Sequence, residues 1–438
     1  MSRPLQTLGW ITRPGPFMDG ARAKYGDVFT VRLTDVTLVF LSDPEDVKRV
    51  FTADPNIVRA GEANVILRPV VGARSVLLLD EPDHMVDRKL MLPPFHGERM
   101  QRYGDTMAEA ARAEIARWPL GGSVSMWPGM QAITLEVIMR AVFGLTDASE
   151  LDHVRDLLQH ATDWTTNARQ LVYMALRGPD RVAENRFFRA VMDPVDEALL
   201  GEIARRRASP DLAERDDILS MLLQARYEDG SAMGDRELRD ELMTLLVAGH
   251  ETTATSLAWA LERLVRHPEQ LDRLRAEARD GEDTYLDAVV KETLRLRPVI
   301  PIVVRVLGEP MELSDGRVIP KGAAVAPCIY LVHRRDDVYP EPTRFSPDRF
   351  LEQPPGTYTW IPFGGGVRRC LGAAFAQFEM KKVLETIIAE LDLEAVSPRS
   401  ERVARRAITL TPAGRATVIA RRRPVPAQAG DEPLARAA

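Results

Sequence analysis

The chain has 438 residues, of which 45% are hydrophobic and 28% are charged, and its formal net charge is −6. This composition is ordinary for a globular protein with a large core, and so small a net charge gives no reason to expect nucleic acid as a partner. Only two cysteines are present, Cys328 and Cys370, which excludes a disulfide scaffold and suits a reducing compartment. We therefore expect a cytoplasmic protein.

The first part of the sequence predicts a small β region followed by helices. Residues 1–19 contain no apolar run long enough for a signal sequence or a membrane span, so we expect no integral membrane association. The pattern predicts a strand, a turn and a strand over residues 24–41, and Asp43-Pro44 predicts the start of a helix that continues through Phe51. Residues 61–80 have no clear period and are predicted to form a loop. From Asp83 to the end of the 260s the pattern is mostly helical.

The second half contains the longest predicted helix and then several short strands. Apolar residues recur at helical spacing over residues 235–266 with few charges in the middle, which is typical of a buried helix. Another helix is predicted over residues 285–296, and it ends before Pro298. Short strands are predicted over residues 302–307, 311–313, 318–319 and 324–329, and proline-rich residues 336–355 are predicted to be irregular. We predict one large, mainly α domain with a small β region over residues 1–420, and a disordered tail over residues 421–438.

A glycine-rich segment, FGGGVRRCLG at residues 363–372, places one cysteine immediately before a helical pattern. The charges of Arg368 and Arg369 and the N-terminus of that helix favour ionisation of Cys370, and the glycines allow backbone N–H groups to approach the sulfur. A thiolate held in this way is a soft metal ligand. The alternative is that Cys370 is a small buried hydrophobic residue, as most free cysteines are.

The spacing Phe-x-x-Gly-x-Arg-x-Cys-x-Gly resembles the haem-binding loop of the cytochrome P450 superfamily. The resemblance implies a haem b cofactor with Cys370 as the axial iron ligand, in a loop shaped by Phe363, Gly364 and Gly372. It extends over nearly the whole chain, from Tyr25-Gly26-Asp27 to Thr409-Leu410-Thr411, and implies the cytochrome P450 fold.

A polar motif, Ala248-Gly249-His250-Glu251-Thr252-Thr253, interrupts the long apolar helix. Glycine is unfavourable inside a helix and threonine can bond back to a preceding carbonyl, so we expect a local opening of the helical ladder. The motif resembles the oxygen-binding groove of the family, which implies that Thr252 assists oxygen activation and that Glu251 passes protons inward. The alternative is a tolerated polar patch on a large helix.

Two further sets of charged residues match the family. The resemblance implies that Glu292, Arg295 and Arg349 form a buried structural network, although Glu292 and Arg295 alone would read as a surface pair. It also implies that cations bind the two haem propionates, and arginine suits this role because its planar guanidinium meets a carboxylate with two hydrogen bonds. The matching cations are Arg368, Arg88, His84 and Arg305, and for each of them the alternative is a solvated surface residue.

These resemblances together imply a haem-thiolate monooxygenase that oxidises an apolar small molecule such as a terpenoid, steroid, fatty acid or polyketide. No nucleotide-binding glycine motif follows a strand, and two cysteines are too few for an iron–sulfur cluster, so we expect electrons from a ferredoxin and its NAD(P)H-dependent reductase. A peroxide-driven haem-thiolate enzyme and a non-catalytic haem-binding protein are the alternatives. Arg68 and Arg74 are candidate anchors for a substrate carboxylate. The expected pocket residues are Val65, Ile66, Leu77, Leu245, Ala248, Val299, Ile300, Val303, Thr409 and Leu410.

Overall fold

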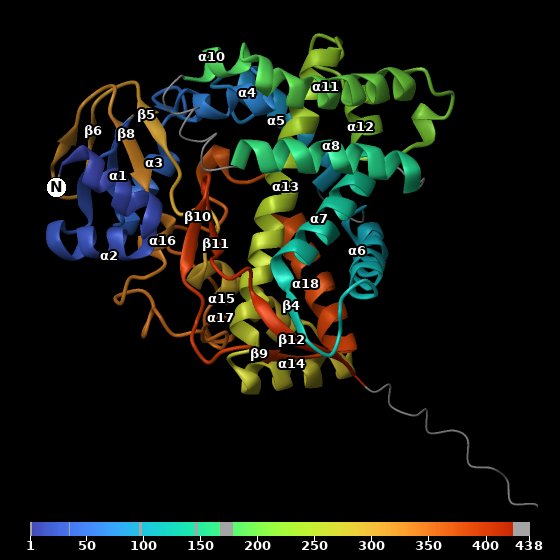
Figure 1. The fold of residues 1–438 in the computed structure, drawn as a ribbon. Coiled ribbons are helices and arrows are strands. Elements are labelled where there is room, and N and C mark those ends of the chain that lie inside the picture. Colours follow the sequence, from blue (N-terminus) through green and yellow to red (C-terminus); the bar gives the residue numbers. More distant parts are fainter. Residues whose placement is uncertain (1, 35, 96–98, 145–147, 167–177, 424–438) are drawn as a thin grey trace, which may run out of the picture.

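The computed structural model describes residues 2–34, 36–95, 99–144, 148–166 and 178–423. Helices dominate, and the strands gather mainly at one side, in agreement with the predicted mainly α fold (Figure 1). The helices are α1 (Arg3–Thr12), α2 (Pro14–Tyr25), α3 (Pro44–Thr52), α4 (Arg68–Val71), α5 (Asp83–Met91), α6 (Arg99–Ile115), α7 (Met126–Phe143), α8 (Ala148–Thr166), α10 (Pro179–Ala183), α11 (Arg186–Arg207), α12 (Ile218–Gln224), α13 (Asp235–Leu264), α14 (Pro268–Asp280), α15 (Thr284–Leu296), α16 (Ile329–Val332), α17 (Arg349–Glu352) and α18 (Ala373–Glu390). Among these residues, none of the helices is both long and apolar enough to cross a membrane.

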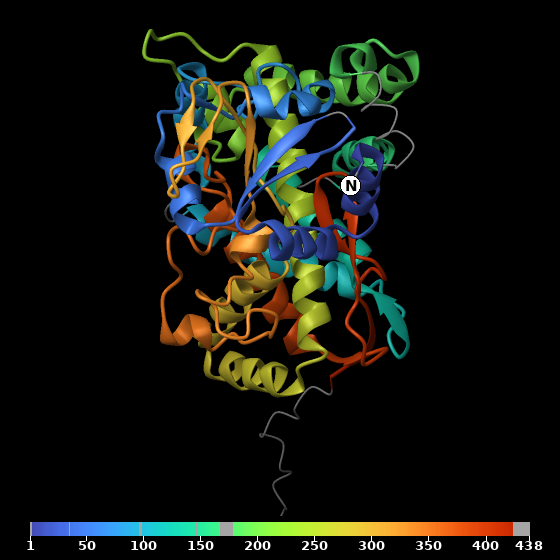
Figure 2. The same cartoon turned by 90° about the vertical axis from the view of Figure 1, so that its left-hand side faces the viewer.

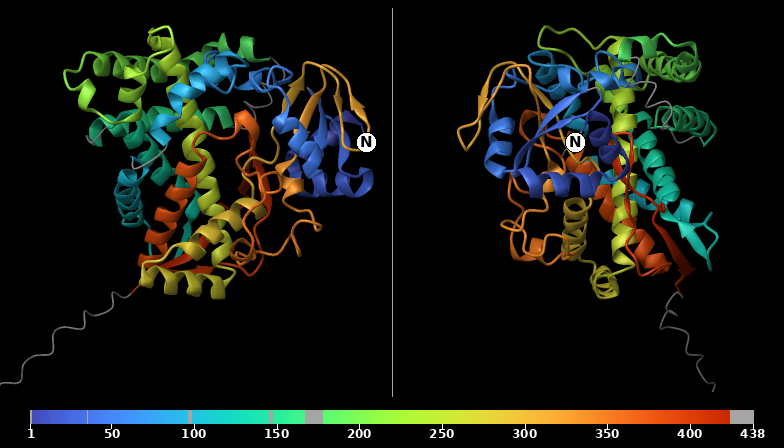
Figure 3. Two further views of the ribbon diagram at one scale, coloured as in Figure 1. Left: turned by 180° about the vertical axis from the view of Figure 1, so that it is seen from behind. Right: turned by 60° about the vertical axis from the view of Figure 1, so that its left-hand side comes forward.

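Helix α13 is the axis of the helical part. Its 30 residues run along the length of the molecule, with α7 and α18 packed against it (Figures 1 and 3). Leu242, Leu246, Leu257 and Leu261 recur at helical spacing, and all four are buried in the largest hydrophobic cluster. Because α13 is surrounded by other helices, its position fixes where its polar motif lies in the protein.

The β region forms at one side, where α1 and α2 lie close to the sheet (Figure 2). Its five-stranded sheet has the order β1-β2-β8-β5-β3, in which β2 and β8 are parallel and the other pairs are antiparallel. Trp10 of α1, which is 4% exposed, packs edge-on against Phe40 of β2. These strands are β1 (Val28–Arg32), β2 (Thr37–Leu41), β3 (Val58–Arg59), β5 (Arg305–Leu307) and β8 (Ala324–Pro327), and β6 (Met311–Glu312) pairs with β7 (Val318–Ile319) in a separate hairpin.

Several features differ from the sequence prediction. The predicted loop at residues 61–80 contains a 3₁₀ helix, η1 (Glu62–Leu67), and α4, because short helical turns leave no hydrophobic period to detect. Sequence reasoning also missed strands that pair over long separations, and one of them, β12, includes Arg421 and Arg422, two residues of the predicted tail. Residues 424–438 of that tail lie outside the described residues. The missed strands are β3, β4 (Ser123–Ser125), β9 (Leu391–Ala395), β10 (Val403–Arg406), β11 (Thr409–Pro412) and β12 (Thr417–Arg422), and the remaining 3₁₀ helices are η2 (Pro93–Phe95), η3 (Leu212–Glu214) and η4 (Gly366–Arg368).

A buried ionic network ties α15 to the irregular segment that follows α16. Arg295 donates from Nε and Nη2 to the Glu292 carboxylate at 2.6 and 2.8 Å, and both side chains are 0% exposed. Arg349 donates from Nε to Oε1 of the same carboxylate at 3.2 Å, and the Ser346 N–H donates to that oxygen at 2.8 Å. The structure therefore brings the three predicted network residues into contact.

His333 connects this network to the glycine-rich loop. Arg295 Nη1 donates to the His333 carbonyl at 2.7 Å, and the Ile361 N–H donates to His333 Nε2 at 2.8 Å. Burial holds the pKa of His333 well below its usual range, which keeps the imidazole neutral and leaves Nε2 free to accept. Since Ile361 is two residues before Phe363, the ionic network reaches the start of the loop through a single side chain.

We predict that Glu292→Ala destabilises the folded protein by about 3–5 kcal/mol, because two buried guanidinium groups lose their counter-ion. Chemical denaturation of the haem-loaded protein measures this free energy, and the amount of haem retained after purification should fall with it. Asp287→Ala is the matched control on the same helix, since it removes a partly exposed pair with Lys291 that is worth only about 0.3–0.5 kcal/mol. Equal stability of the two variants would contradict the prediction.

Candidate active site

The loop that carries Cys370 is shaped by contact with the end of α3. Gly364 and Gly366 have φ of 69° and 67°, a backbone conformation that favours glycine. A Cβ atom on Gly365 would lie 2.2 Å from the Phe51 ring, and one on Gly366 would lie 2.1 Å from the Phe51 carbonyl oxygen. These glycines therefore allow close packing on Phe51, and the backbone N–H that reaches the sulfur is that of Gly372 instead.

Cys370 lies just before α18 with its backbone fixed and its side chain accessible. Its N–H donates to the Phe363 carbonyl at 3.0 Å, and the residue is exposed. Although the residue is exposed as a whole, the surrounding protein atoms raise the pKa of the thiol by desolvation, and the Gly372 N–H, Arg88 and Arg369 only partly offset this. The sequence expectation of easy ionisation was therefore wrong for the protein by itself. A bound metal cation would supply the missing stabilisation, because a coordinated thiol loses its proton.

The four predicted propionate cations gather around the loop. The charges of Arg368 and Arg88 both lower the pKa of His84, which burial lowers most, and the charge of Arg368 also acts on Arg305. Arg368 donates to the carbonyls of Val76, at 3.2 Å, and Leu79. Arg88 Nη2 donates to the Arg369 carbonyl at 2.7 Å. The structure thus brings all four residues into one electrostatic cluster.

Arg305 is the member of this cluster that best fits an anionic group. Arg305 lies on β5 and is only 6% exposed, and its Nη1 donates to the Val304 carbonyl at 2.8 Å. Burial lowers its pKa to about 10, and the nearby charge of Arg368 contributes. A buried guanidinium is stabilised by a carboxylate, and haem carries two of them. The cation cluster and the accessible thiol therefore both fit a haem.

Two carboxylates that sequence reasoning missed also belong to this cluster. Asp80 Oδ1 lies 3.1 Å from Arg368 Nη2, and the same carboxylate accepts the N–H groups of Gly61 and Glu62. Glu81 Oε1 lies 2.7 Å from His84 Nδ1. Their only signal in the sequence is that two adjacent acids precede the helix of His84. They show that the cations are oriented by the protein and not only by a ligand.

Helix α13 exposes a short strip in the middle of an otherwise buried length. From Leu238 to Leu264, every residue is buried except Val247, Ala248, Gly249 and Thr252. The strip therefore coincides with the polar motif, and it gives a small molecule access to this part of the helix. Gly249 has a packing reason as well, because a Cβ atom there would lie 3.3 Å from Ile138 Cδ1 of α7. The expected opening of the helical ladder is not present, since α13 is a continuous α-helix.

The side chains of the motif take different directions. Thr252 Oγ1 donates to the Ala248 carbonyl at 2.7 Å. Glu251 is 7% exposed, and its Oε1 lies 3.7 Å from Arg406 Nε and 3.5 Å from Thr409 Oγ1, both on the β10–β11 hairpin. Arg406 is a further residue that sequence reasoning missed, because nothing in the sequence pairs that hairpin with α13.

The predicted pocket residues divide into two groups. Leu245 and Leu410 belong to hydrophobic clusters, and Val299 is buried with its carbonyl accepting the Leu410 N–H at 2.7 Å. Thr409 is buried against Glu251. The remaining residues, which keep partly or largely exposed side chains, are Val65, Ile66, Leu77, Ala248, Ile300 and Val303.

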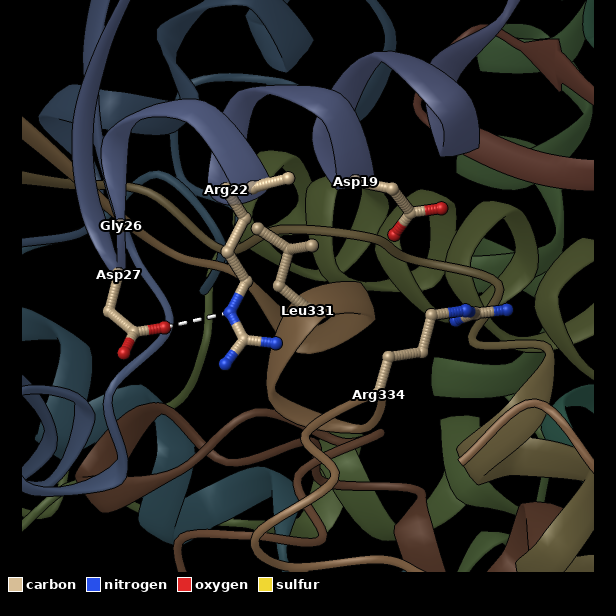
Figure 4. A pocket seen from close by; sticks show the side chains of 7 residues that line it. Asp19, Arg22, Gly26, Asp27, Leu331 and Arg334 are labelled. Atoms are coloured by element: carbon tan, nitrogen blue, oxygen red, sulfur yellow. Dashed lines mark hydrogen bonds and ion pairs between the residues drawn. The ribbon is translucent and has the colours of Figure 1, made fainter. Parts of the chain in front are cut away.

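A cavity of about 360 Å³ lies elsewhere, between α2 and α16 (Figure 4). Arg22 and Asp27 form an ion pair of 2.8 Å at its wall. None of the residues predicted for the haem, proton or substrate sites lines this cavity, whose lining is Asp19, Arg22, Ala23, Gly26, Asp27, Leu331 and Arg334. It is therefore not the predicted active site.

Comparison with known proteins identifies the family. The sequence model described as cytochrome P450 matches residues 6–416. The chain is 43% identical over 410 residues to a Mycobacterium tuberculosis protein described as cytochrome P450 135B1, with 90% of this chain and 85% of that protein covered. It is 39% identical over 394 residues to cytochrome P450 137 of the same organism, with 89% and 82% covered.

Solved structures agree with these sequence relatives. Retinoic acid-bound cyanobacterial CYP120A1 superimposes with a TM-score of 0.82 at 23% identity, covering 95% of this chain and 96% of that one, which shows the shared fold. The haem domain of cytochrome P450DA also gives a TM-score of 0.82, at 25% identity with 95% of each chain covered. Because the family model spans nearly the whole chain and close relatives share over a third of its residues, this chain belongs to the cytochrome P450 family and is a haem-dependent P450 monooxygenase.

Proposed function

We propose that this P450 binds haem b through Cys370 and oxidises a neutral, apolar small molecule with electrons from an external ferredoxin. The observation that carries the proposal is the combination of an exposed cysteine before α18 with a partly buried cation cluster beside it. When bound, the haem supplies the activation of dioxygen and the transfer of one oxygen atom to the substrate. The protein supplies the iron ligand, the charges that hold the propionates, and a path for protons.

The cations divide the work of holding the haem. Arg305 and Arg88 would bind propionate, because each guanidinium donates to a main-chain carbonyl, that of Val304 and that of Arg369. Arg368 is paired with Asp80 and donates to two main-chain carbonyls, which holds the segment before α5. Only the part of its guanidinium that these partners leave available would bind a propionate. His84 is buried against Glu81, and its uncharged imidazole would donate a hydrogen bond to a propionate.

Proton delivery is assigned to Glu251 and Thr252. The Arg406 side chain is 22% exposed and lies beside the nearly buried Glu251 carboxylate, which gives this carboxylate a connection toward solvent. Thr252 follows it in the sequence and lies on the exposed strip of α13, where its hydroxyl can accept a hydrogen bond while it donates to the Ala248 carbonyl. This arrangement favours use of dioxygen over a peroxide-driven reaction, which needs no proton input from the solvent.

The substrate class follows from the side chains that remain accessible. Those near the exposed strip and the loop before α5 are aliphatic. Both candidate anchors for a substrate carboxylate are engaged, because Arg68 pairs with Asp180 at 2.8 Å and Arg74 pairs with Glu237 at 3.2 Å. We therefore favour an uncharged terpenoid, steroid or polyketide over a fatty acid. A library screened for substrate-induced Soret shifts tests this, and selective binding of carboxylic acids would contradict it.

The state of the two cysteines bears on where the protein works in the cell. Cys328 is buried beside Met18 and Cys370 is free, so neither cysteine is in a disulfide. This is the state expected in a reducing cytoplasm, and we include that location in the proposal. Measuring activity in fractionated cells of the source organism would test it.

We predict that Cys370→Ala abolishes the carbon-monoxide difference band typical of thiolate-ligated haem, because the iron loses its sulfur ligand. Cys328→Ala is the control, since this cysteine is buried in a hydrophobic cluster, with its sulfur 3.7 Å from that of Met18. The spectrum of the reduced protein under carbon monoxide measures both. Retention of the band by Cys370→Ala would remove the iron ligand from the proposal.

We predict that Thr252→Ala lowers the yield of oxidised product per electron by at least about tenfold and diverts electrons to hydrogen peroxide. Thr253→Ala is the matched control, because Thr253 also donates to a carbonyl one turn back, that of Gly249 at 3.0 Å, but it is buried. Product and peroxide are quantified in the same reaction with a surrogate redox pair. Equal coupling in both variants, or full turnover with hydrogen peroxide alone, would favour the peroxide-driven alternative.

The electron donor is expected to dock near the cysteine loop. Arg369 is exposed beside Cys370, and Lys89 is exposed with only a loose pair of 3.5 Å to Glu228, whereas Lys381 pairs with Asp283 at 2.6 Å. An acidic ferredoxin would be attracted to the first two cations.

We predict that the rate of reduction by an acidic ferredoxin falls as salt is added, because screening weakens this attraction. Arg369→Glu should be slower than the natural protein at low salt, and the two rates should converge at high salt. Stopped-flow reduction under carbon monoxide measures the rates. A reduction rate that is independent of salt in both proteins would rule out electrostatic docking here.

A further inference from the structure

The N-terminal half of α13 packs against α4 and the segment that follows it (Figure 1). A group of buried carboxylates lies at this contact and on α5. Asp240 and Glu241 of α13 are 8% and 0% exposed, and Asp87 of α5 is 1% exposed. Neither haem binding nor proton delivery, as proposed above, uses any of the three. Buried carboxylates are costly unless they are paired or protonated, so their presence requires a reason.

The first observation is that two of these carboxylates fasten the backbone of one short segment. Asp240 Oδ2 accepts the Arg74 N–H at 2.9 Å, and Glu241 Oε1 accepts the Val76 N–H at 2.8 Å. Between them, Thr244 Oγ1 donates to Ser75 Oγ at 2.6 Å. Residues 74–76 are therefore attached to α13 at three consecutive positions. We call this arrangement the α13 clamp.

The backbone next to the clamp is built for close approach. Gly72 has φ of 88°, and a Cβ atom there would lie 2.0 Å from Asp240 Oδ1. A side chain at this position would push the carboxylate away from the Arg74 N–H. Only glycine at position 72 therefore permits the close contact between residues 74–76 and α13.

The second observation is that the same segment holds Arg368. The carbonyls of Val76 and Leu79 accept from the Arg368 guanidinium, and Asp80 pairs with it at 3.1 Å. Val76 therefore bonds through its N–H to α13 and through its carbonyl to the cysteine loop. The α13 clamp connects the central helix to a proposed haem-binding arginine across a single residue.

The third observation concerns charge. Glu241 Oε2 and Asp87 Oδ2 are buried and have no hydrogen-bond partner among the described residues. Burial and the neighbouring Asp87 raise the pKa of Glu241 well above its usual range, and burial also raises the pKa of Asp87. The charged groups that act on Glu241 are Asp87, Asp240 and Arg74, and behind them Asp83, Tyr227 and Glu237 face Asp87 while Arg239 pairs with Asp240. Carboxylates outnumber cations in this set, so a proton on Glu241 relieves the repulsion.

We propose that Glu241 is a positioning residue that, in its protonated form, keeps residues 74–76 on α13 and thereby holds Arg368 in place, and that loss of this proton opens the α13 clamp. The part that concerns Arg368 rests on the proposed haem-binding function. A group that binds its proton more tightly in the closed state stabilises that state at low pH, and this stabilisation is lost as pH rises toward its pKa in the folded protein. The clamp should therefore open with rising pH.

Trypsin cleavage after Arg74 reports opening directly. The haem-loaded protein is digested briefly at a series of values between about pH 5 and about pH 8, and a synthetic peptide of residues 71–78 in the same tube corrects for the pH dependence of trypsin. We expect corrected cleavage to rise with pH, by up to about tenfold per pH unit if one proton is released. The rate of haem transfer to apomyoglobin should rise over the same range.

Two kinds of variant distinguish the effect of the proton on Glu241 from the effect of nearby charge. Glu241→Gln keeps the shape of the protonated acid, so its cleavage should stay low and independent of pH, whereas Glu241→Ala should be cleaved readily at every pH. Glu237→Gln is the matched control, because it neutralises a carboxylate 3.2 Å from Arg74 one turn earlier and should keep the pH dependence of the natural protein. If Glu241→Ala does not fold, Glu241→Gln alone decides.

A pH dependence that persists in Glu241→Gln, or is absent from the natural protein, would overturn the proposal, as would its loss in Glu237→Gln. Cleavage at Arg74 requires no spectral signal from haem, so the clamp can be judged even if the assignment of Cys370 or Arg368 fails. Conversely, pH-dependent cleavage with an unchanged rate of haem transfer would retain the clamp and reject its connection to Arg368.

Discussion

The buried carboxylate of Glu292 is the constraint on which much of the structure depends. It has two oxygens and no access to solvent, so its charge is balanced only within the protein, by Arg295 and Arg349. Arg295 also binds a segment distant in sequence, because it donates to the carbonyls of His333, Pro342 and Arg344. The irregular segment that follows α16 has few backbone hydrogen bonds of its own. Its conformation is fixed because a buried ion pair tolerates little displacement.

The position of the cysteine loop follows from that path. His333 accepts from the Ile361 N–H, and the loop then turns tightly against Phe51 at glycines that leave no room for a side chain. From the opposite side, Arg368 fastens the loop to the segment before α5. The thiol therefore has its place set by three separate parts of the chain, none of which is adjacent to it in sequence. This explains how a flexible, glycine-rich sequence can present one sulfur atom reproducibly.

Helix α13 collects the remaining functional contacts. Near its middle it exposes the strip with Thr252, and Glu251 reaches from there to the β10–β11 hairpin. About two to three turns earlier, Asp240, Glu241 and Thr244 hold the segment that leads to Arg368. A long helix that is buried on nearly all sides holds both regions, and in the clamp proposed above Val76 carries the effect of Glu241 protonation to the cysteine loop.

The sequence by itself determined the long helix, through its strong helical period. Its resemblance to the family pointed to Cys370 as the proposed iron ligand and to the three members of the Glu292 network. The sequence could not determine which side chains meet across long separations. The pairing of Glu251 with Arg406, the balance of Arg368 by Asp80 and the raised pKa of Cys370 depend on burial and on neighbours far along the chain. The strands β4, β9 and β12 escaped detection for the same reason, since each is stabilised by a partner that local sequence does not name.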